Sequence, residues 1–163
     1  MKKILAIGAL LASFNTTAND EKIQIQLDKL YVGGGVSQNV IDSPFGGSNL
    51  DASGFSLFAG YTLNDDIEQV DTSVELGYSQ TGDFVGNNDI SGIWLSAVAQ
   101  KHLPEIDNRL SALARAGVDF GDDDGMFMGF GAAFQLIPQL DIRAEFINKD
   151  ASTVYQLAAI YKF

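Results

Sequence analysis

The stretch TVYQLAAIYKF, residues 153–163, carries the clearest strand pattern in the chain. One of its two faces, made of every second residue, is apolar throughout, whereas the other face carries Gln156 and Lys162. The members of the apolar face are Tyr155, Leu157, Ala159, Tyr161 and Phe163. An alternation of period two predicts a β-strand with one face toward an apolar environment.

Seven further stretches are strand-like and are separated by breaks rich in Gly, Asn, Asp and Pro. The eight predicted strands are Lys29–Gln38, Gly54–Leu63, Gln69–Gln80, Ile90–Lys101, Arg109–Phe120, Met126–Leu136, Leu140–Ile147 and Thr153–Phe163. In the fourth strand, Ile93 and Trp94 compete for the apolar outer face. We predict that Ile93 faces outward, because the opposite choice would turn Ser96 and Gln100 outward.

The fold class follows from where the apolar faces can be buried. Past the N-terminal region no apolar run is long enough for a transmembrane helix, and a sheet crosses lipid only as a closed barrel. A soluble barrel with an apolar interior is the alternative. The aromatic residues of the apolar faces gather at two levels, which suits the two interfaces of a bilayer. One level holds Phe55, Tyr78, Phe120, Phe146 and Tyr155, and the other holds Tyr61, Phe134, Tyr161 and Phe163. We therefore predict an all-β fold, an eight-stranded antiparallel up-and-down transmembrane β-barrel.

The N-terminus has the three regions of an export signal. Lys2 and Lys3 are basic, and Ile4–Phe14 is apolar but too short to span a bilayer. Small residues lead up to Ala18. We predict a cleaved signal peptide over residues 1–18, cut between Ala18 and Asn19, followed by a barrel domain over residues 19–163. A buried N-terminal helix is the alternative.

Composition excludes several functions. The formal charge is −11, from 10 Lys and Arg against 21 Asp and Glu, and such an acidic chain repels nucleic acid. The absence of Cys excludes disulfides, thiolate zinc sites and a cysteine nucleophile.

Two short segments could suggest a catalytic or metal site. His102, the only histidine, is predicted in a turn next to Pro104. Asp122–Gly125 fits a hairpin turn better than a calcium loop. We predict no enzyme, and no catalytic, cofactor or metal site.

Four charged residues near the middle of their strands lie on the predicted inward face. They are Glu75, Arg115, Arg143 and Glu145. An eight-stranded barrel has little interior beyond its own side chains, and buried charge needs a partner. We predict an ion-pair network that fills the lumen, with inward glycines such as Gly33 and Gly131 leaving room for the long side chains. A solvated polar face is the alternative.

The chain resembles the small eight-stranded outer-membrane barrels, the OmpA-type transmembrane domain and OmpX-like proteins, over residues 19–163. The resemblance rests on the alternating C-terminal strand with its terminal aromatic residue and on Tyr31–Gly35. It implies the outer membrane of a Gram-negative bacterium, a monomer, periplasmic termini, and contact with outer-membrane lipid and lipopolysaccharide. It also implies that Tyr155, Leu157, Ala159, Tyr161 and Phe163 form the signal read by the barrel assembly machinery.

The function favoured by the sequence is structural: a barrel that contributes to envelope integrity, with its lumen blocked by side chains. A surface-loop binding or adhesion module is the alternative, with Val40–Ser53 as its main apolar loop (Ile41, Phe45 and Leu50). A narrow channel for ions or very small solutes is the second alternative.

Overall fold

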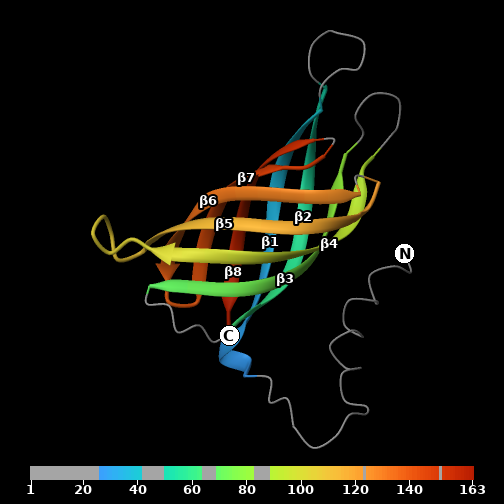
Figure 1. Ribbon diagram of the computed structural model, residues 1–163. Helices are drawn as coiled ribbons and strands as arrows, with labels where there is room; N and C mark the ends of the chain where they lie inside the picture. Colours follow the sequence, from blue (N-terminus) through green and yellow to red (C-terminus); the bar gives the residue numbers. More distant parts are fainter. Residues whose placement is uncertain (1–25, 42–49, 64–68, 83–88, 123, 151) are drawn as a thin grey trace, which may run out of the picture.

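The computed structural model describes residues 26–41, 50–63, 69–82, 89–122, 124–150 and 152–163. Within these residues, eight antiparallel strands close into one barrel (Figure 1). The strands are β1 (Leu30–Ile41), β2 (Leu50–Thr62), β3 (Val70–Thr81), β4 (Ser91–His102), β5 (Leu110–Gly121), β6 (Gly125–Ile137), β7 (Leu140–Asn148) and β8 (Thr153–Lys162). One 3₁₀ turn, η2 (Leu27–Lys29), precedes β1. The predicted fold class is confirmed.

The first and last strands, β1 and β8, pair with each other and close the barrel. Their register begins at the pair Tyr31 and Lys162 and ends at the pair Val40 and Thr153. A closed sheet has no edge left to pair, which is the condition for strands in lipid. We call the end at which β1 begins and β8 ends the proximal end, and the opposite one the distal end. The β2–β3, β4–β5 and β6–β7 connections lie at the proximal end, and the other four lie at the distal end.

The outer surface of the barrel is apolar. Along β4, Ile93 is 54% exposed and Trp94 only 4%, which confirms the predicted outward facing of Ile93. Large apolar side chains such as Phe120 and Met126 are also exposed around the outside. An apolar exterior that alternates with a more polar interior is typical of barrels in outer membranes. Within the described residues, no helix has the length and apolar character needed to cross a membrane.

Two predicted boundaries are wrong at the ends of the barrel. β1 runs on to Ile41 and β2 begins at Leu50, and these two residues pair with each other, so both ends of the predicted loop Val40–Ser53 are strand. Residues 42–49, which include Phe45, lie outside the described residues. His102 is the last residue of β4 rather than part of a turn. In both places the extended backbone continues because a neighbouring strand is present to pair with it.

The lumen holds two clusters of buried apolar residues that the sequence analysis did not identify. The larger cluster consists of Tyr31, Phe58, Trp94, Phe127, Ile147, Val154, Ala158 and Ile160. The smaller one consists of Val98, Leu113 and Ala133. Neighbouring rings of the larger cluster pack against one another, with Trp94 5.8 Å from Phe58 and 6.3 Å from Phe127 between centroids. The interior is therefore part polar and part aromatic.

Glycines make room for these rings. A Cβ atom at Gly77 would lie 2.3 Å from the Trp94 ring, and one at Gly33 would lie 2.2 Å from the Phe58 ring. The prediction that Gly33 leaves room for a charged side chain is therefore wrong, because an aromatic ring occupies that space. Gly131 does face a charged side chain, since its Cβ would lie 3.0 Å from Cγ of Glu145.

Candidate functional site in the barrel lumen

The structure brings the four predicted lumen charges together around Glu75. Arg143 Nη1 donates to Glu75 Oε1 at 2.7 Å, and Arg115 Nη2 donates to Glu75 Oε2. Arg115 Nε lies 2.9 Å from Glu145 Oε1. The four side chains come from β3, β5 and β7, alternate strands whose inward residues meet across a narrow interior. Glu75 is fully buried, and each of the four is at most 5% exposed.

Aromatic side chains complete this cluster. The Tyr31 hydroxyl donates to Glu75 Oε1 at 2.8 Å and lies 2.8 Å from Ser73 Oγ. The guanidinium of Arg115 lies 5.3 Å from the centre of the Trp94 ring, a favourable cation–π arrangement. Tyr31 was missed as a member of the network. The sequence does indicate that Tyr31 points inward, because it lies two residues before Gly33 on the same face. The alternation of a strand does not, however, show which strand a side chain contacts across the lumen.

A second ion pair lies at the distal end. Lys149 Nζ is 2.5 Å from Asp119 Oδ2, and both side chains are largely buried. The Lys149 amine also lies 6.0 Å from the centre of the Phe127 ring, within reach of the larger apolar cluster. This pair could not be predicted from period-two alternation, because Lys149 follows the end of β7 and so lies outside the strand.

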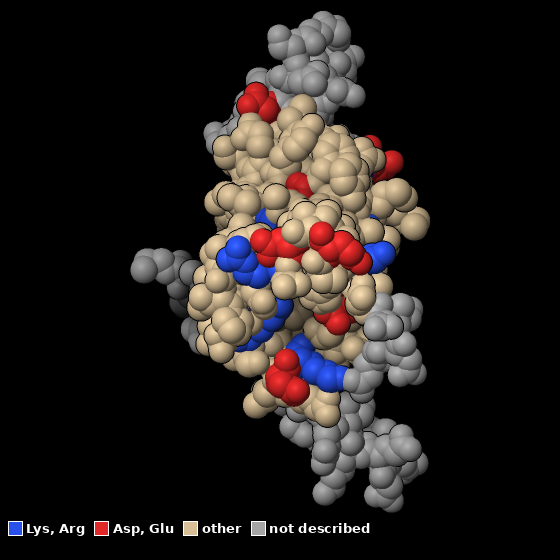
Figure 2. All heavy atoms as spheres, turned by 90° about the vertical axis from the view of Figure 1, so that its left-hand side faces the viewer, with Lys and Arg blue, Asp and Glu red and all other residues tan. Residues whose placement is uncertain are grey.

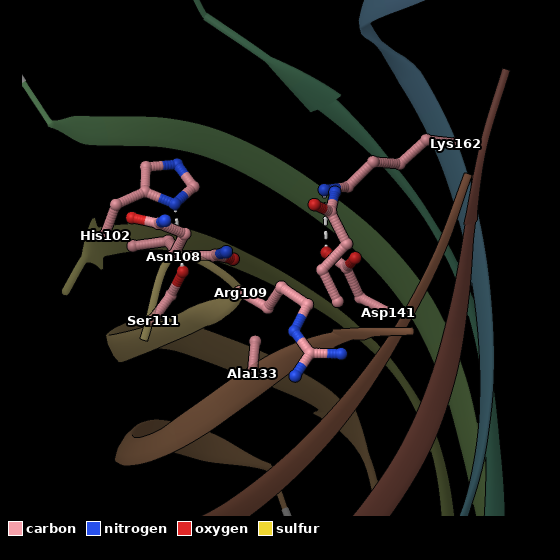
Figure 3. A pocket seen from close by; sticks show the side chains of 9 residues that line it. His102, Asn108, Arg109, Ser111, Ala133, Asp141 and Lys162 are labelled. Atoms are coloured by element: carbon pink, nitrogen blue, oxygen red, sulfur yellow. Dashed lines mark hydrogen bonds and ion pairs between the residues drawn. The ribbon is translucent and has the colours of Figure 1, made fainter. Parts of the chain in front are cut away.

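The proximal end is a polar opening. Figure 2 views the molecule from the side on which β4 ends, and shows a hollow there with Lys and Arg side chains beside Asp and Glu. A cavity of about 60 Å³ lies at this end, lined in part by His102, Ser111 and Asp141 (Figure 3). Lys162 forms a salt bridge with Asp141, with 2.7 Å between Lys162 Nζ and Asp141 Oδ2.

His102 contacts two other strands at this opening. Its Nδ1 lies 3.1 Å from Ser111 Oγ on β5 (Figure 3). Its Nε2 lies 2.8 Å from Asp71 Oδ2 on β3. In the nearby turn, the backbone N–H of Arg109 donates to Asp107, which holds the pKa of that carboxyl below its ordinary value. These partners of His102 could not be predicted from the sequence, because Asp71 and Ser111 are 31 and 9 residues away in the chain.

The C-terminal stripe lies on the outer surface. Tyr155, Leu157, Ala159 and Tyr161 face outward along β8, and Phe163 follows directly after it. The rings of Tyr161 and Phe163 meet edge to face, with centroids 5.4 Å apart. The predicted cleavage site at Ala18 and Asn19 lies outside the described residues. The described residues contain no group of three or more His, Cys, Asp or Glu side chains placed to hold a metal.

Comparison with known proteins places this barrel among outer-membrane proteins. Neisserial surface protein A has a TM-score of 0.60 and 14% identity over 83% of this chain and 97% of its own. Ail, the attachment invasion locus protein of Yersinia pestis, has a TM-score of 0.53 and 18% identity over 82% of this chain and 97% of its own. A de novo designed transmembrane β-barrel has a TM-score of 0.58 and 15% identity over 85% of this chain and 98% of its own.

These structural likenesses concern the fold alone, and no curated protein sequence matches the chain. The family described as outer membrane protein beta-barrel domain matches residues 4–163, nearly the whole sequence. This match agrees with the closed barrel, with its apolar exterior, and with the resemblance noted from the C-terminal strand. The chain therefore belongs to the outer membrane protein β-barrel domain family.

Proposed function

We propose that this protein is a structural barrel of a Gram-negative outer membrane that contributes to envelope integrity, with its lumen closed by side chains. The observation that carries the proposal is the buried cluster around Glu75, in which two acids and two arginines contact one another across the barrel. Because the four charges sum to zero and are paired, the cluster is better suited to filling the lumen than to attracting an ion through it.

Closure is further supported by the side chains next to that cluster. Phe58, Trp94 and Phe127 pack together beside it. The Asp119–Lys149 pair adjoins these rings, since Asp119 is the strand partner of Trp94 and Lys149 Nζ lies 6.0 Å from the centre of the Phe127 ring. Val98 and Leu113 belong to a second buried apolar cluster. A solute crossing the barrel would have to displace these groups. No catalytic step is needed for this role.

The orientation proposed here has both mature termini, and therefore the proximal end, in the periplasm. The last strand supports it, because its outward stripe from Tyr155 to Phe163 ends at the proximal rim, where an assembly machinery working from the periplasm would meet it. The remaining partners proposed are outer-membrane lipid and lipopolysaccharide around the apolar exterior. A closed barrel with no free edge suits a monomer.

A binding role at the distal loops is the second candidate. Its support is the likeness to the Yersinia pestis protein, which is named for attachment and invasion. We rank it second because β1 and β2 extend to Ile41 and Leu50, which shortens the connection expected to provide the main binding surface.

One experiment separates these two functions. The protein is deleted in its own host, and envelope leakiness is measured by uptake of a fluorescent hydrophobic dye and by sensitivity to a large antibiotic. Under the structural proposal, deletion raises both, and complementation restores them with the wild type and with a variant in which residues 42–49 are replaced by Gly and Ser. Unchanged leakiness on deletion would overturn the structural proposal. Restoration by the wild type alone would favour the binding role.

A further inference from the structure

The opening at the proximal end contains a serine, a histidine and an aspartate in one hydrogen-bonded row. Ser111 Oγ lies 3.1 Å from His102 Nδ1, and the opposite ring nitrogen, Nε2, lies 2.8 Å from Asp71 Oδ2. Each residue comes from a different strand, so the row depends on the register of β3, β4 and β5. His102 is the only histidine in the protein. We propose that these three residues form a hydrolytic centre that cleaves small acyl esters.

The contacts assign a role to each ring nitrogen. The Asp71 carboxylate is an acceptor only, so it favours the tautomer in which Nε2 carries the proton. Nδ1 then has a free lone pair that accepts the Ser111 hydroxyl proton. A nucleophile, a base and a group that orients the base are the three parts of serine hydrolysis. The two ring nitrogens are exchanged relative to the usual triad, but either nitrogen serves as base when the other is held protonated.

The cavity beside Ser111 offers donors for a developing oxyanion. Gln100, Asn108 and Gln135 line it together with Ser111 and His102 (Figure 3). Among the described residues, none of these three amide side chains makes a side-chain hydrogen bond with another residue. Side-chain amides that are not otherwise engaged are suitable donors to the oxygen of a tetrahedral intermediate.

The size of the cavity limits the substrate. Its volume of about 60 Å³ holds only a few water molecules, so we expect an acetyl-sized acyl group to be favoured over a long chain. The leaving group would remain toward solvent, because the side chains of His102 and Asp71 are 43% and 57% exposed. Water reaches the same side and is available for the second step.

The reaction balances with residues of this chain and water alone. Ser111 Oγ bonds to the ester carbonyl carbon while its proton moves to His102 Nδ1. The carbon–oxygen bond to the leaving alkoxide then breaks, and that oxygen takes the proton from Nδ1. Water attacks the acyl-serine by the same route and releases the carboxylic acid. Ser111 and His102 are the catalytic residues, and Asp71 is a positioning residue. This activity is independent of the structural role proposed above.

The competing explanation is that the three hydrogen-bonded residues only hold the strands together, in which case Ser111 is not a nucleophile. A second serine in the lumen is a matched control that separates the two explanations. Ser96 is as buried as Ser111, 2% against 3% exposed, but its hydroxyl has no hydrogen-bond partner among the described residues. A reactive serine should therefore be found at position 111 and not at position 96.

The test uses the whole protein, purified and folded in detergent micelles. It is treated with a fluorophosphonate probe, and the labelled peptide is identified by mass spectrometry. Hydrolysis of 4-nitrophenyl acetate and 4-nitrophenyl octanoate is measured in parallel. We expect label on Ser111, faster hydrolysis of the acetate ester, and no change in Ser96→Ala. His102→Ala should lower the rate about 100-fold, the usual contribution of a general base. Asp71→Asn should lower kcat and leave KM unchanged.

Each variant is checked for the electrophoretic shift between heated and unheated samples, which reports a closed barrel. If Ser111→Ala does not close, Ser111→Cys takes its place. It should lose the fluorophosphonate label and gain iodoacetamide alkylation at position 111 in a protein that otherwise has no thiol. Absence of label on the folded wild type, or equal ester hydrolysis by wild type and His102→Ala, would overturn the proposal.

Discussion

At the scale of single residues, Arg115 has the largest consequence for stability. Its guanidinium is shared between Glu75 and Glu145 and is shielded from water. Arg115→Ala should lower the free energy of unfolding by about 3–5 kcal/mol, because it leaves buried carboxylates without their partner. Urea unfolding of the protein in lipid vesicles gives this value. Arg109→Ala is the control, since its side chain is 56% exposed at the rim and should cost at most about 1 kcal/mol. A loss that small at Arg115 would mean that water reaches the cluster.

Gly77 offers a second test at the same scale, because it touches the only tryptophan of the chain. Gly77→Ala should push the Trp94 ring out of its place, shift its fluorescence, and destabilise the barrel by about 1–3 kcal/mol, as overpacking usually does. Gly34→Ala is the matched control. Its Cβ would meet a flexible Leu57 side chain at 3.2 Å on the outside. Equal fluorescence spectra for Gly77→Ala and the wild type would contradict the packing described for Trp94.

The side of the barrel wall toward which each side chain points could be predicted from the sequence, but its contacts across the lumen could not. The facing of Glu75, Arg115, Arg143 and Glu145 follows from period two, because a strand alternates its side chains strictly. Contacts across the lumen depend also on the stagger between strands, which closure of the barrel sets and local sequence does not. For this reason the row from Asp71 to Ser111 through His102 was missed.

At the scale of the element, all eight strands were predicted, and only the distal ends of β1 and β2 differ from the prediction by more than one residue. The apolar face of β8 is unambiguous in sequence, whereas Val40–Ser53 contains Ser, Asp and Asn, which favour turns when considered locally. Pairing between β1 and β2 overrides that preference up to Ile41. The inward aromatic residues Phe58 and Phe127 were missed for a related reason, because apart from Trp94 the aromatic residues considered were those of the membrane-facing surface.

The last strand provides the prediction at this scale. Deleting Phe163, or Tyr161 and Phe163 together, should reduce the amount of folded protein in the outer membrane much more than it lowers the stability of barrels that have already formed. The reason proposed is that the outward stripe of β8 is read during assembly. Outer-membrane yield and the heat-dependent electrophoretic shift measure the effect, and Phe163→Trp is the control that keeps a terminal aromatic side chain. Wild-type yield from the truncated protein would show that the terminus carries no assembly signal.

At the scale of the whole molecule, the proposed barrier to conduction consists of two levels in series. The first is the charged cluster at Glu75. The second, toward the distal end, is made of the aromatic rings beside that cluster and the adjoining Asp119–Lys149 pair. The narrowest level that remains limits the flow, so opening one level alone should change conductance little. This dependence distinguishes a packed interior from a channel with one gate.

Planar-bilayer recording tests that arrangement. The wild type should give no stable, large conductance, and Arg115→Ala alone should remain close to it, because the rings of Phe58 and Trp94 still fill the adjacent level. Combining Arg115→Ala with Phe58→Ala, Trp94→Ala and Lys149→Ala should open both levels together and raise the conductance well above that of Arg115→Ala alone or of the other three changes without it. Arg109→Ala at the rim is the control. Large conductance from the wild type, unaltered by the combined variant, would mean that ions pass by another route, and would favour the narrow channel over the closed structural barrel.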